Sequence, residues 1–381
     1  MSLKRFLNIF KRFDKRIFIT ATILFSLGLL MIYSSSNVTA IMNDASPGRY
    51  FQKELIFLVF GLAACSIFIF FNTKSYYKLF SFGLLIIGIS MFLLFVYGKA
   101  VNGATNWIGY KGLGIQPSEF AKVFIIPFFA FYYEKNKNDY MDYKKMLFPI
   151  VIAVIFMAFM VLQNDYGTAL IFSLVVAFMF YVSPASFKIK KNLTLVGIFA
   201  ILVFVIAILI GGDKVLDADK IARFNYFNPC DRYLTTGNQL CNGYIAMNNG
   251  GLLGKGLGNS TQKYLYLPEG HTDFIFAIFV EELGLIGAIG LLILYGYLIF
   301  SIYKCGRRAV KCSHKIICYG VAAYIFIHII TNLGGVLGLI PLTGVPLIFL
   351  SYGGSICWAT LIALCFVERV SYETNLLKSK K

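Results

Sequence analysis

The stretch LPEGHTDFIFAIFVEELG, residues 267–284, gathers titratable side chains at the start of an apolar segment. Glu269 and His271 precede the segment, and Asp273 begins it. A carboxylate at a membrane boundary is a functional candidate by default, and one held at the rim of a helix bundle can act as a general base. Asp273 is therefore our candidate catalytic base, with Glu269 and His271 as candidate substrate contacts. The structural alternative is that Asp273 or Thr272 only caps the helix that follows.

The stretch QPSEFAK, residues 116–122, combines an acid and a base at the expected start of a helix. Pro117 suits the first helical position because an N–H group is not needed there. Glu119 and Lys122 are three residues apart and therefore share a helix face. They either form an internal ion pair, or Lys122 binds a phosphate or diphosphate. Gln116 joins them as a candidate substrate contact.

Three further acids lie close to the apolar segments. Asp165, in QNDYGTA, falls in a tight turn between two of them, where a turn residue and a functional residue are both consistent with the sequence. Glu281 and Glu282 lie about two helical turns beyond Asp273. Because a buried charge requires a partner, we expect one of these two to pair with a cation inside the bundle and the other to reach a cavity.

The segment 212–272 is much longer than a connector and is rich in glycine and aromatic residues. Loops of this length in compact proteins usually carry function or are disordered, and the aromatic residues favour a folded loop at the membrane surface. Cys230 and Cys241 share this loop, and a disulfide between them is an open alternative because the loop is expected outside the cell. Arg223 and Arg232 either contact an anionic head group or are solvated.

The stretch IPLTGVPLIFLSYGGS, residues 340–355, cannot form a continuous helix because Pro341, Gly344 and Pro346 interrupt it. Irregular backbone at membrane depth must be buried in protein or line a cavity. We therefore expect a cavity wall here, with Ser351 as a candidate substrate contact.

The composition restricts the class of protein. Of 381 residues, 58% are hydrophobic and 14% are charged, and the mean hydropathy is +0.73. A soluble domain could not bury this much apolar surface, so the sequence predicts an all-α polytopic membrane protein. We expect about ten transmembrane helices and one long structured extracellular loop, with the apolar segments near 17–35, 54–72, 79–98, 117–133, 146–163, 168–183, 193–211, 273–300, 316–338 and 354–368.

The basic residues predict the orientation. With ten spans both termini are cytoplasmic, and of the 35 Lys and Arg residues 24 then lie on the cytoplasmic side and 10 outside. This asymmetry explains the net charge of +17 by anionic inner-leaflet lipid, with no nucleic acid as partner. We expect a single membrane domain over residues 1–381, with cytoplasmic tails at 1–16 and 369–381, the extracellular loop at 212–272, and an interfacial or re-entrant loop at 102–119.

The chain contains no Walker motif, dinucleotide fingerprint or zinc signature. It does contain QPSEFAK, QNDYGTA, GLGNSTQKYLYLPEGHTDFIF and PLTGVPLIFLSYGGS in an order that resembles the SEDS family of bacterial cell-wall proteins, which includes FtsW, RodA and SpoVE. The resemblance covers nearly the whole chain. The stretch GLGNSTQKYLYLPE looks closer to the FtsW branch and PLTGVPLIFLSYGG closer to RodA, and we favour the FtsW branch.

The resemblance implies a peptidoglycan glycosyltransferase that polymerises lipid II at the outer face of the cytoplasmic membrane and releases undecaprenyl diphosphate. The essential aspartate of the family corresponds to Asp273, which would take the proton from the 4-hydroxyl of the acceptor sugar in an inverting transfer. The leaving diphosphate requires positive charge. Lys122, held by Glu119, is the first candidate and Arg223 the next. A divalent cation, Mg or Mn, could share this task, and the sequence identifies no metal site.

The resemblance also implies partners and a place in the cell. The expected partner is a class B penicillin-binding protein that acts as transpeptidase, within the divisome or elongasome, and the expected location is the division septum. Three alternatives remain open at this point: an elongation-type, RodA-like polymerase, a lipid II flippase or other transporter, and a scaffold that only recruits the transpeptidase.

Overall fold

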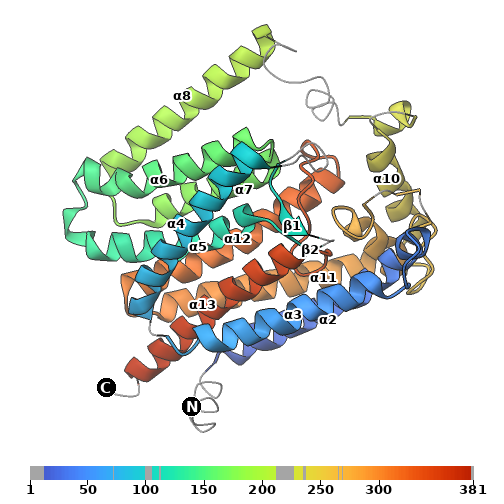
Figure 1. Ribbon diagram of the computed structural model, residues 1–381, viewed down its shortest axis with the longest axis horizontal. Coiled ribbons are helices and arrows are strands. Elements are labelled where there is room, and N and C mark those ends of the chain that lie inside the picture. Colours follow the sequence, from blue (N-terminus) through green and yellow to red (C-terminus); the bar gives the residue numbers. More distant parts are fainter. Residues whose placement is uncertain are drawn as a thin grey trace.

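The computed structural model describes residues 13–71, 73–98, 105–110, 113–211, 227–234, 237–264, 266–267 and 269–378. Each of the ten predicted apolar segments coincides with a long helix, so the prediction of an all-α polytopic fold is confirmed (Figure 1). The helices are α2 (Lys15–Met42), α3 (Arg49–Phe68), α4 (Thr73–Tyr97), α5 (Pro117–Lys135), α6 (Tyr143–Leu162), α7 (Tyr166–Val182), α8 (Phe187–Gly211), α11 (Ile275–Arg308), α12 (Cys312–Val336) and α13 (Gly354–Lys378).

Among the described residues, seven helices are long and apolar enough to cross a bilayer, namely α2, α3, α4, α6, α11, α12 and α13, and α7 is a shorter apolar helix. Burial separates the central helices from the peripheral ones. The most apolar window of α13 is 89% buried and that of α12 78%, against 17% for α3. The helices α5, α12 and α13 thus form the centre of the bundle, whereas α3 exposes its apolar side chains as a lipid-facing helix does.

The loops contain short elements of their own. A hairpin of β1 (Ile108–Tyr110) and β2 (Leu113–Ile115) pairs Gly109 with Gly114, in the region where we expected an interfacial or re-entrant loop. The long loop contains the 3-10 turn η3 (Pro229–Arg232) and the helix α10 (Asn238–Gly250), which packs against α11. A further 3-10 turn, η1 (Lys137–Asp139), joins α5 to α6. The described part of the long loop is therefore folded, as the aromatic residues indicated.

The start of α2 and the end of α13 lie together at one end of the bundle, and α10 lies at the other (Figure 1). The backbone N–H of Asp14 donates to Glu368 Oε2 over 3.0 Å at this junction. Residues 369–378, which we expected in a tail, continue α13 instead. Arg369 is buried there, donating to the carbonyl of Ile69 over 2.6 Å and to Glu373 over 3.0 Å.

Helix α11 is broken at Gly284, which has a φ of 69°. The gap in the helical hydrogen bonds is filled by the preceding loop: Lys255 N–H donates to the carbonyl of Glu281 and Leu285 N–H to that of Gly251, over 3.0 and 2.9 Å. A Cβ at Gly284 would lie 2.4 Å from the backbone nitrogen of Gly254. Only glycine fits this position, because both its φ and its contact exclude a side chain.

The acids Glu281 and Glu282 fix the same loop to α11. Glu281 accepts from Ser260 Oγ over 2.5 Å and from Lys255 Nζ over 3.0 Å. Glu282 accepts from Ser34 Oγ over 2.6 Å and from Lys263 Nζ over 3.3 Å. The prediction that one acid pairs with a cation is confirmed for both, and the prediction that the other reaches a cavity is wrong, because both carboxylates are fully buried under the loop.

Candidate functional site

A cavity of about 1180 Å³ gathers residues from all four predicted stretches. The prediction that 340–355 forms a cavity wall is confirmed. The lining also includes residues of the β1–β2 hairpin and of α10. From the predicted stretches, it contains Gln116, Glu119, Asn164, Asp165, Tyr166, Gly167, Thr168, Glu269, Thr272, Asp273, Thr343, Gly344, Val345, Pro346, Tyr352, Gly353, Gly354 and Ser355.

Asp273 stands in the non-helical turn directly before α11. The N-cap position of that helix is Phe274, which supplies no side-chain hydrogen bond. The carboxylate of Asp273 faces Gly344: a Cβ built on Gly344 would lie 3.4 Å from Asp273 Oδ2. The backbone carbonyl of Asp273 accepts from Asn332 Nδ2 over 2.8 Å. The half-buried carboxylate is thus held at a defined point of the cavity wall.

Glu269 and His271 occupy different surroundings although they are close in sequence. Glu269 lines the cavity and accepts from the Thr272 hydroxyl over 2.6 Å. The ring of His271 instead packs against Tyr50 and Tyr352, with centroids 4.8 and 6.0 Å away. Burial lowers the pKa of His271, and the charge of Glu269 offsets this only in part, so the imidazole is neutral at pH 7.

Glu119 and Lys122 form the internal ion pair that was one of the two alternatives. Lys122 Nζ donates to Glu119 Oε1 over 2.6 Å and lies 3.1 Å from His328 Nε2 on α12. The side chain of Lys122 is fully buried and does not line the cavity, whereas Glu119 does. In this arrangement Lys122 reaches the cavity only through Glu119, so its predicted contact with a diphosphate stays a prediction that requires the pair to open.

Asp165 joins the outer ends of three segments. Its Oδ2 accepts from Asn106 Nδ2 over 2.8 Å, from Gln116 Nε2 over 2.7 Å and from Ser118 Oγ over 3.2 Å. Its Oδ1 accepts from the N–H of Thr168 and caps α7. The turn role is therefore present, and the same network also orients Gln116 at the cavity wall.

Ser351 is buried and does not line the cavity. Its hydroxyl forms hydrogen bonds with backbone groups. Its hydroxyl donates to the carbonyl of Thr272 over 2.6 Å and accepts from Leu347 N–H over 2.8 Å. Arg223, the second candidate for the leaving group, lies outside the described residues.

The charged residues that line the cavity determine whether the lining itself could stabilise a leaving diphosphate. The described lining residues include the carboxylates Glu119, Asp165, Glu269 and Asp273, and no Lys or Arg. Within the described ranges, no group of three or more His, Cys, Asp or Glu residues is arranged to hold a metal ion. A divalent cation that shares the stabilisation of the leaving diphosphate stays a prediction, and we derive no step through one.

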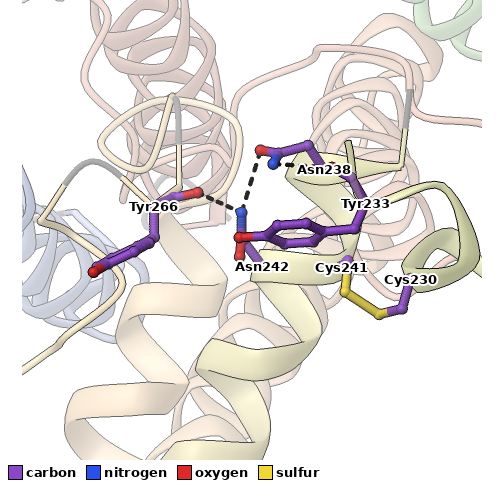
Figure 2. The surroundings of a disulfide bond; sticks show 6 residues. All are labelled: Cys230, Tyr233, Asn238, Cys241, Asn242 and Tyr266. Carbon is purple, nitrogen blue, oxygen red and sulfur yellow. Dashed lines mark hydrogen bonds between the residues drawn. A yellow bond between two sulfur atoms is a disulfide. The ribbon is translucent and has the colours of Figure 1, made fainter. Parts of the chain in front are cut away.

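The described part of the long loop is closed by a disulfide. Cys230 in η3 and Cys241 in α10 are bonded, as Figure 2 shows. On α10, Asn242 Nδ2 donates to the carbonyl of Tyr266, which ties the helix to the segment before α11 (Figure 2). Gln239, two residues before Cys241, lines the cavity. The disulfide thus fixes the helix that brings Gln239 to the site.

Several residues around the cavity were not predicted, notably Asn106, Gln239, His328 and Asn332. The last two carried a usable signal, because they are polar side chains inside the apolar segment 316–338. Asn106 and Gln239 lie in polar loops, where nothing in the sequence sets them apart from solvated neighbours.

Comparison with known proteins identifies the family. The FtsW/RodA/SpoVE family, described as cell cycle proteins, matches residues 14–376. A probable peptidoglycan glycosyltransferase FtsW of Bacillus subtilis (strain 168) is 34% identical over 377 residues, which cover 97% of this chain and 93% of the relative. Stage V sporulation protein E of the same organism is 32% identical over 367 residues, covering 94% and 96%.

Solved structures share the fold. A chain from a peptidoglycan synthase complex that coordinates polymerization and crosslinking superposes with a TM-score of 0.77 at 22% identity, over 95% of this chain and 98% of that one. The rod shape determining protein RodA of Thermus thermophilus superposes with a TM-score of 0.65 at 23% identity, over 94% and 96%. The family match over nearly the whole chain confirms the resemblance in the sequence: this protein belongs to the FtsW/RodA/SpoVE family.

Proposed function

We propose that this protein is a peptidoglycan glycosyltransferase that polymerises lipid II at the outer face of the cytoplasmic membrane, on the FtsW-like, cell-division branch of the family. The observation that carries the proposal is the position of Asp273, whose carboxylate faces Gly344 in a cavity lined by all four family-like stretches. The relatives named FtsW, which are called probable peptidoglycan glycosyltransferases, support it along almost the full chain.

In the proposed reaction Asp273 accepts the proton of the acceptor's 4-hydroxyl as that oxygen attacks the anomeric carbon of the donor. The new β-1,4 bond forms while the bond from that carbon to the diphosphate oxygen breaks, and the diphosphate leaves with the electron pair. One base is sufficient, because the transfer inverts the anomeric centre without a covalent intermediate. A positioned general base contributes about 10²–10⁴-fold to such a step.

The other cavity residues have supporting roles in this proposal. Gln116 and Gln239 line the cavity with amides that can hydrogen-bond the hydroxyl and acetamido groups of the sugars, whereas Asn106 supports Asp165. Glu269 and Thr272, four residues and one residue before the base, form a hydrogen-bonded pair. The positive charge that stabilises the leaving diphosphate is assigned first to Lys122, once its pair with Glu119 opens, and next to Arg223.

We also propose a class B penicillin-binding protein as the transpeptidase partner within the divisome, and the division septum as the location. The membrane helices support a membrane protein, and the excess of Lys and Arg in the loops predicted inside supports cytoplasmic termini. The similar fold of a chain from a complex that couples polymerization to crosslinking is consistent with such a partner.

The test is polymerisation of labelled lipid II by purified protein, with and without its cognate transpeptidase. We expect polymer from the wild type and at least a 10²-fold lower rate from Asp273→Asn. Asp139→Asn, which removes an exposed partner of Lys145, is the matched control and should keep full activity. If the wild type makes no polymer with its partner, lipid II transport across vesicles becomes the activity to measure. If Asp273→Asn polymerises normally, the assigned base is wrong.

A further inference from the structure

Three consecutive backbone carbonyls lead into α11, and each accepts a hydrogen bond from a residue of α12 or of the segment before α13. The carbonyl of His271 accepts from Tyr352 N–H over 3.0 Å, and that of Thr272 from the Ser351 hydroxyl over 2.6 Å. The carbonyl of Asp273 accepts from Asn332 Nδ2 over 2.8 Å. The turn that carries Asp273 is thus fixed by α12 and by the segment before α13, and not by α11 alone.

Asn332 donates hydrogen bonds to two backbone segments, the one that carries the Asp273 carboxylate and the one that this carboxylate faces. Its amide nitrogen also donates to the carbonyl of Val345 over 2.8 Å. Val345 directly follows Gly344, the residue that Asp273 Oδ2 faces. Both partners of the amide are carbonyl oxygens, which only accept, so the nitrogen of Asn332 must be the atom that faces them.

Burying the amide of Asn332 costs stability, and this cost indicates the role of the residue. Asn332 lies in α12 and is 3% exposed. Its Oδ1 is buried and accepts no hydrogen bond from the described residues. An unpaired buried carbonyl oxygen is destabilising. An amide is therefore kept here for its two N–H donors, and these connect the base to its wall.

We propose that Asn332 is a positioning residue for the reaction: its amide sets the separation between the Asp273 carboxylate and the wall at Gly344. This inference rests on the function proposed above, because it assigns Asn332 a role through Asp273. Removing the amide releases the Asp273 backbone and the Val345 backbone at once. A shift of about 1 Å at a reacting group can reduce the rate about 10²-fold, while binding contacts elsewhere in the cavity are unaffected.

The test compares Asn332→Ala and Asn332→Asp with Tyr295→Phe. The aspartate variant keeps the shape of the side chain but supplies at most one donor, so it separates loss of donors from loss of packing. Tyr295→Phe is the matched control, because it removes a buried 2.6 Å hydrogen bond to the carbonyl of Ile348 in the same wall without touching the Asp273 turn. For each variant we would measure kcat and KM for lipid II, thermal unfolding in detergent, and amide hydrogen exchange.

We expect both Asn332 variants to lose about 10²-fold in kcat with KM within about threefold of wild type. Tyr295→Phe should lower the unfolding temperature to a similar degree but keep kcat within about threefold. Amide exchange should rise in residues 270–274 for the Asn332 variants only, and in 343–350 for all three. Equal kcat values in Asn332→Ala and Tyr295→Phe would overturn the proposal, and so would a loss that appears only in KM.

The experiments give a different result if the proposed glycosyltransferase function is wrong. In that case the wild type with its partner makes no polymer, and the exchange measurement still decides the positioning role. Unchanged exchange of residues 270–274 in Asn332→Ala would overturn that role whatever the activity of the protein.

Discussion

Gly344→Ala tests whether the space in front of Asp273 is needed by a substrate. Gly344 has a φ of 66°, where an L-residue costs about 1–2 kcal/mol. Its new methyl group would lie 3.4 Å from Asp273 Oδ2, which is ordinary van der Waals contact and causes no clash. A hydroxyl that donates to this oxygen must approach to about 2.7–2.8 Å, and the methyl group closes one side of that approach.

The expected result is a loss of activity much larger than the loss of stability. Obstructing the base removes part of a contribution of about 10²–10⁴-fold, so kcat for lipid II polymerisation should fall at least about tenfold. The unfolding free energy should fall by about 1–2 kcal/mol from the backbone alone. A membrane protein that stays folded tolerates such a loss of stability. The decrease in kcat is therefore due to the obstruction of Asp273.

A second glycine provides the control. Gly258 has a φ of 82°, and a Cβ at this position meets nothing within 4 Å. Gly258→Ala therefore carries a comparable backbone penalty at a distance from the base, and should keep kcat within about twofold. The assay is initial-rate polymerisation of labelled lipid II together with thermal unfolding of both variants. Equal rates for Gly344→Ala and Gly258→Ala would refute our account of how the acceptor approaches Asp273.

Two other predictions concern the outer face. Reduction of Cys230–Cys241, or Cys230→Ser with Cys241→Ser, opens a loop with a sequence separation of 11 and should cost α10 about 3 kcal/mol of local stability, seen as faster amide exchange in 238–250 with little change in 312–336. His271 has a folded pKa below its ordinary value near 6.5, so its contribution to stability is complete above that value and decreases as the pH falls through it. His271→Phe should therefore flatten the decrease in unfolding temperature between about pH 7 and 5, and an unchanged slope would contradict the assignment.

Much of the fold could be predicted because a bilayer limits the choices. An apolar run near 20 residues must be helical in lipid, since each backbone group has to be paired within its own segment. The hairpin at 108–115 could not be predicted in this way, because strands of three residues are too short to show a recognisable hydrophobic pattern. The extension of α13 to Lys378 could not be predicted either. The polar side chains of its last turns pack against neighbouring helices and loops, and the sequence alone does not reveal these contacts.

The candidate site was predictable in its members and less so in their roles. Pro341, Gly344 and Pro346 require irregular backbone, and irregular backbone at membrane depth requires a cavity, so that wall could be inferred. The i,i+3 spacing of Glu119 and Lys122 gives a shared face but not its depth, and the depth makes Lys122 an interior residue. The roles of Glu281 and Glu282 depend on a loop that folds back from positions about 20 residues earlier, and helical spacing contains no information about that contact.

The break in α11 brings the backbones of Gly254 and Gly284 into direct contact, so substitutions at these two positions depend on each other. Gly254 and Gly284 approach so closely that a Cβ on Gly254 would lie 2.6 Å from the nitrogen of Gly284, and the reverse contact is shorter still. Neither residue can acquire a side chain while the other stays in place. Substitution at either one would have to rebuild the loop and the short helical piece that follows Asp273 together. The two glycines should therefore be inherited as a unit, because a chain that lost one of them would need different contacts to support the turn that carries Asp273.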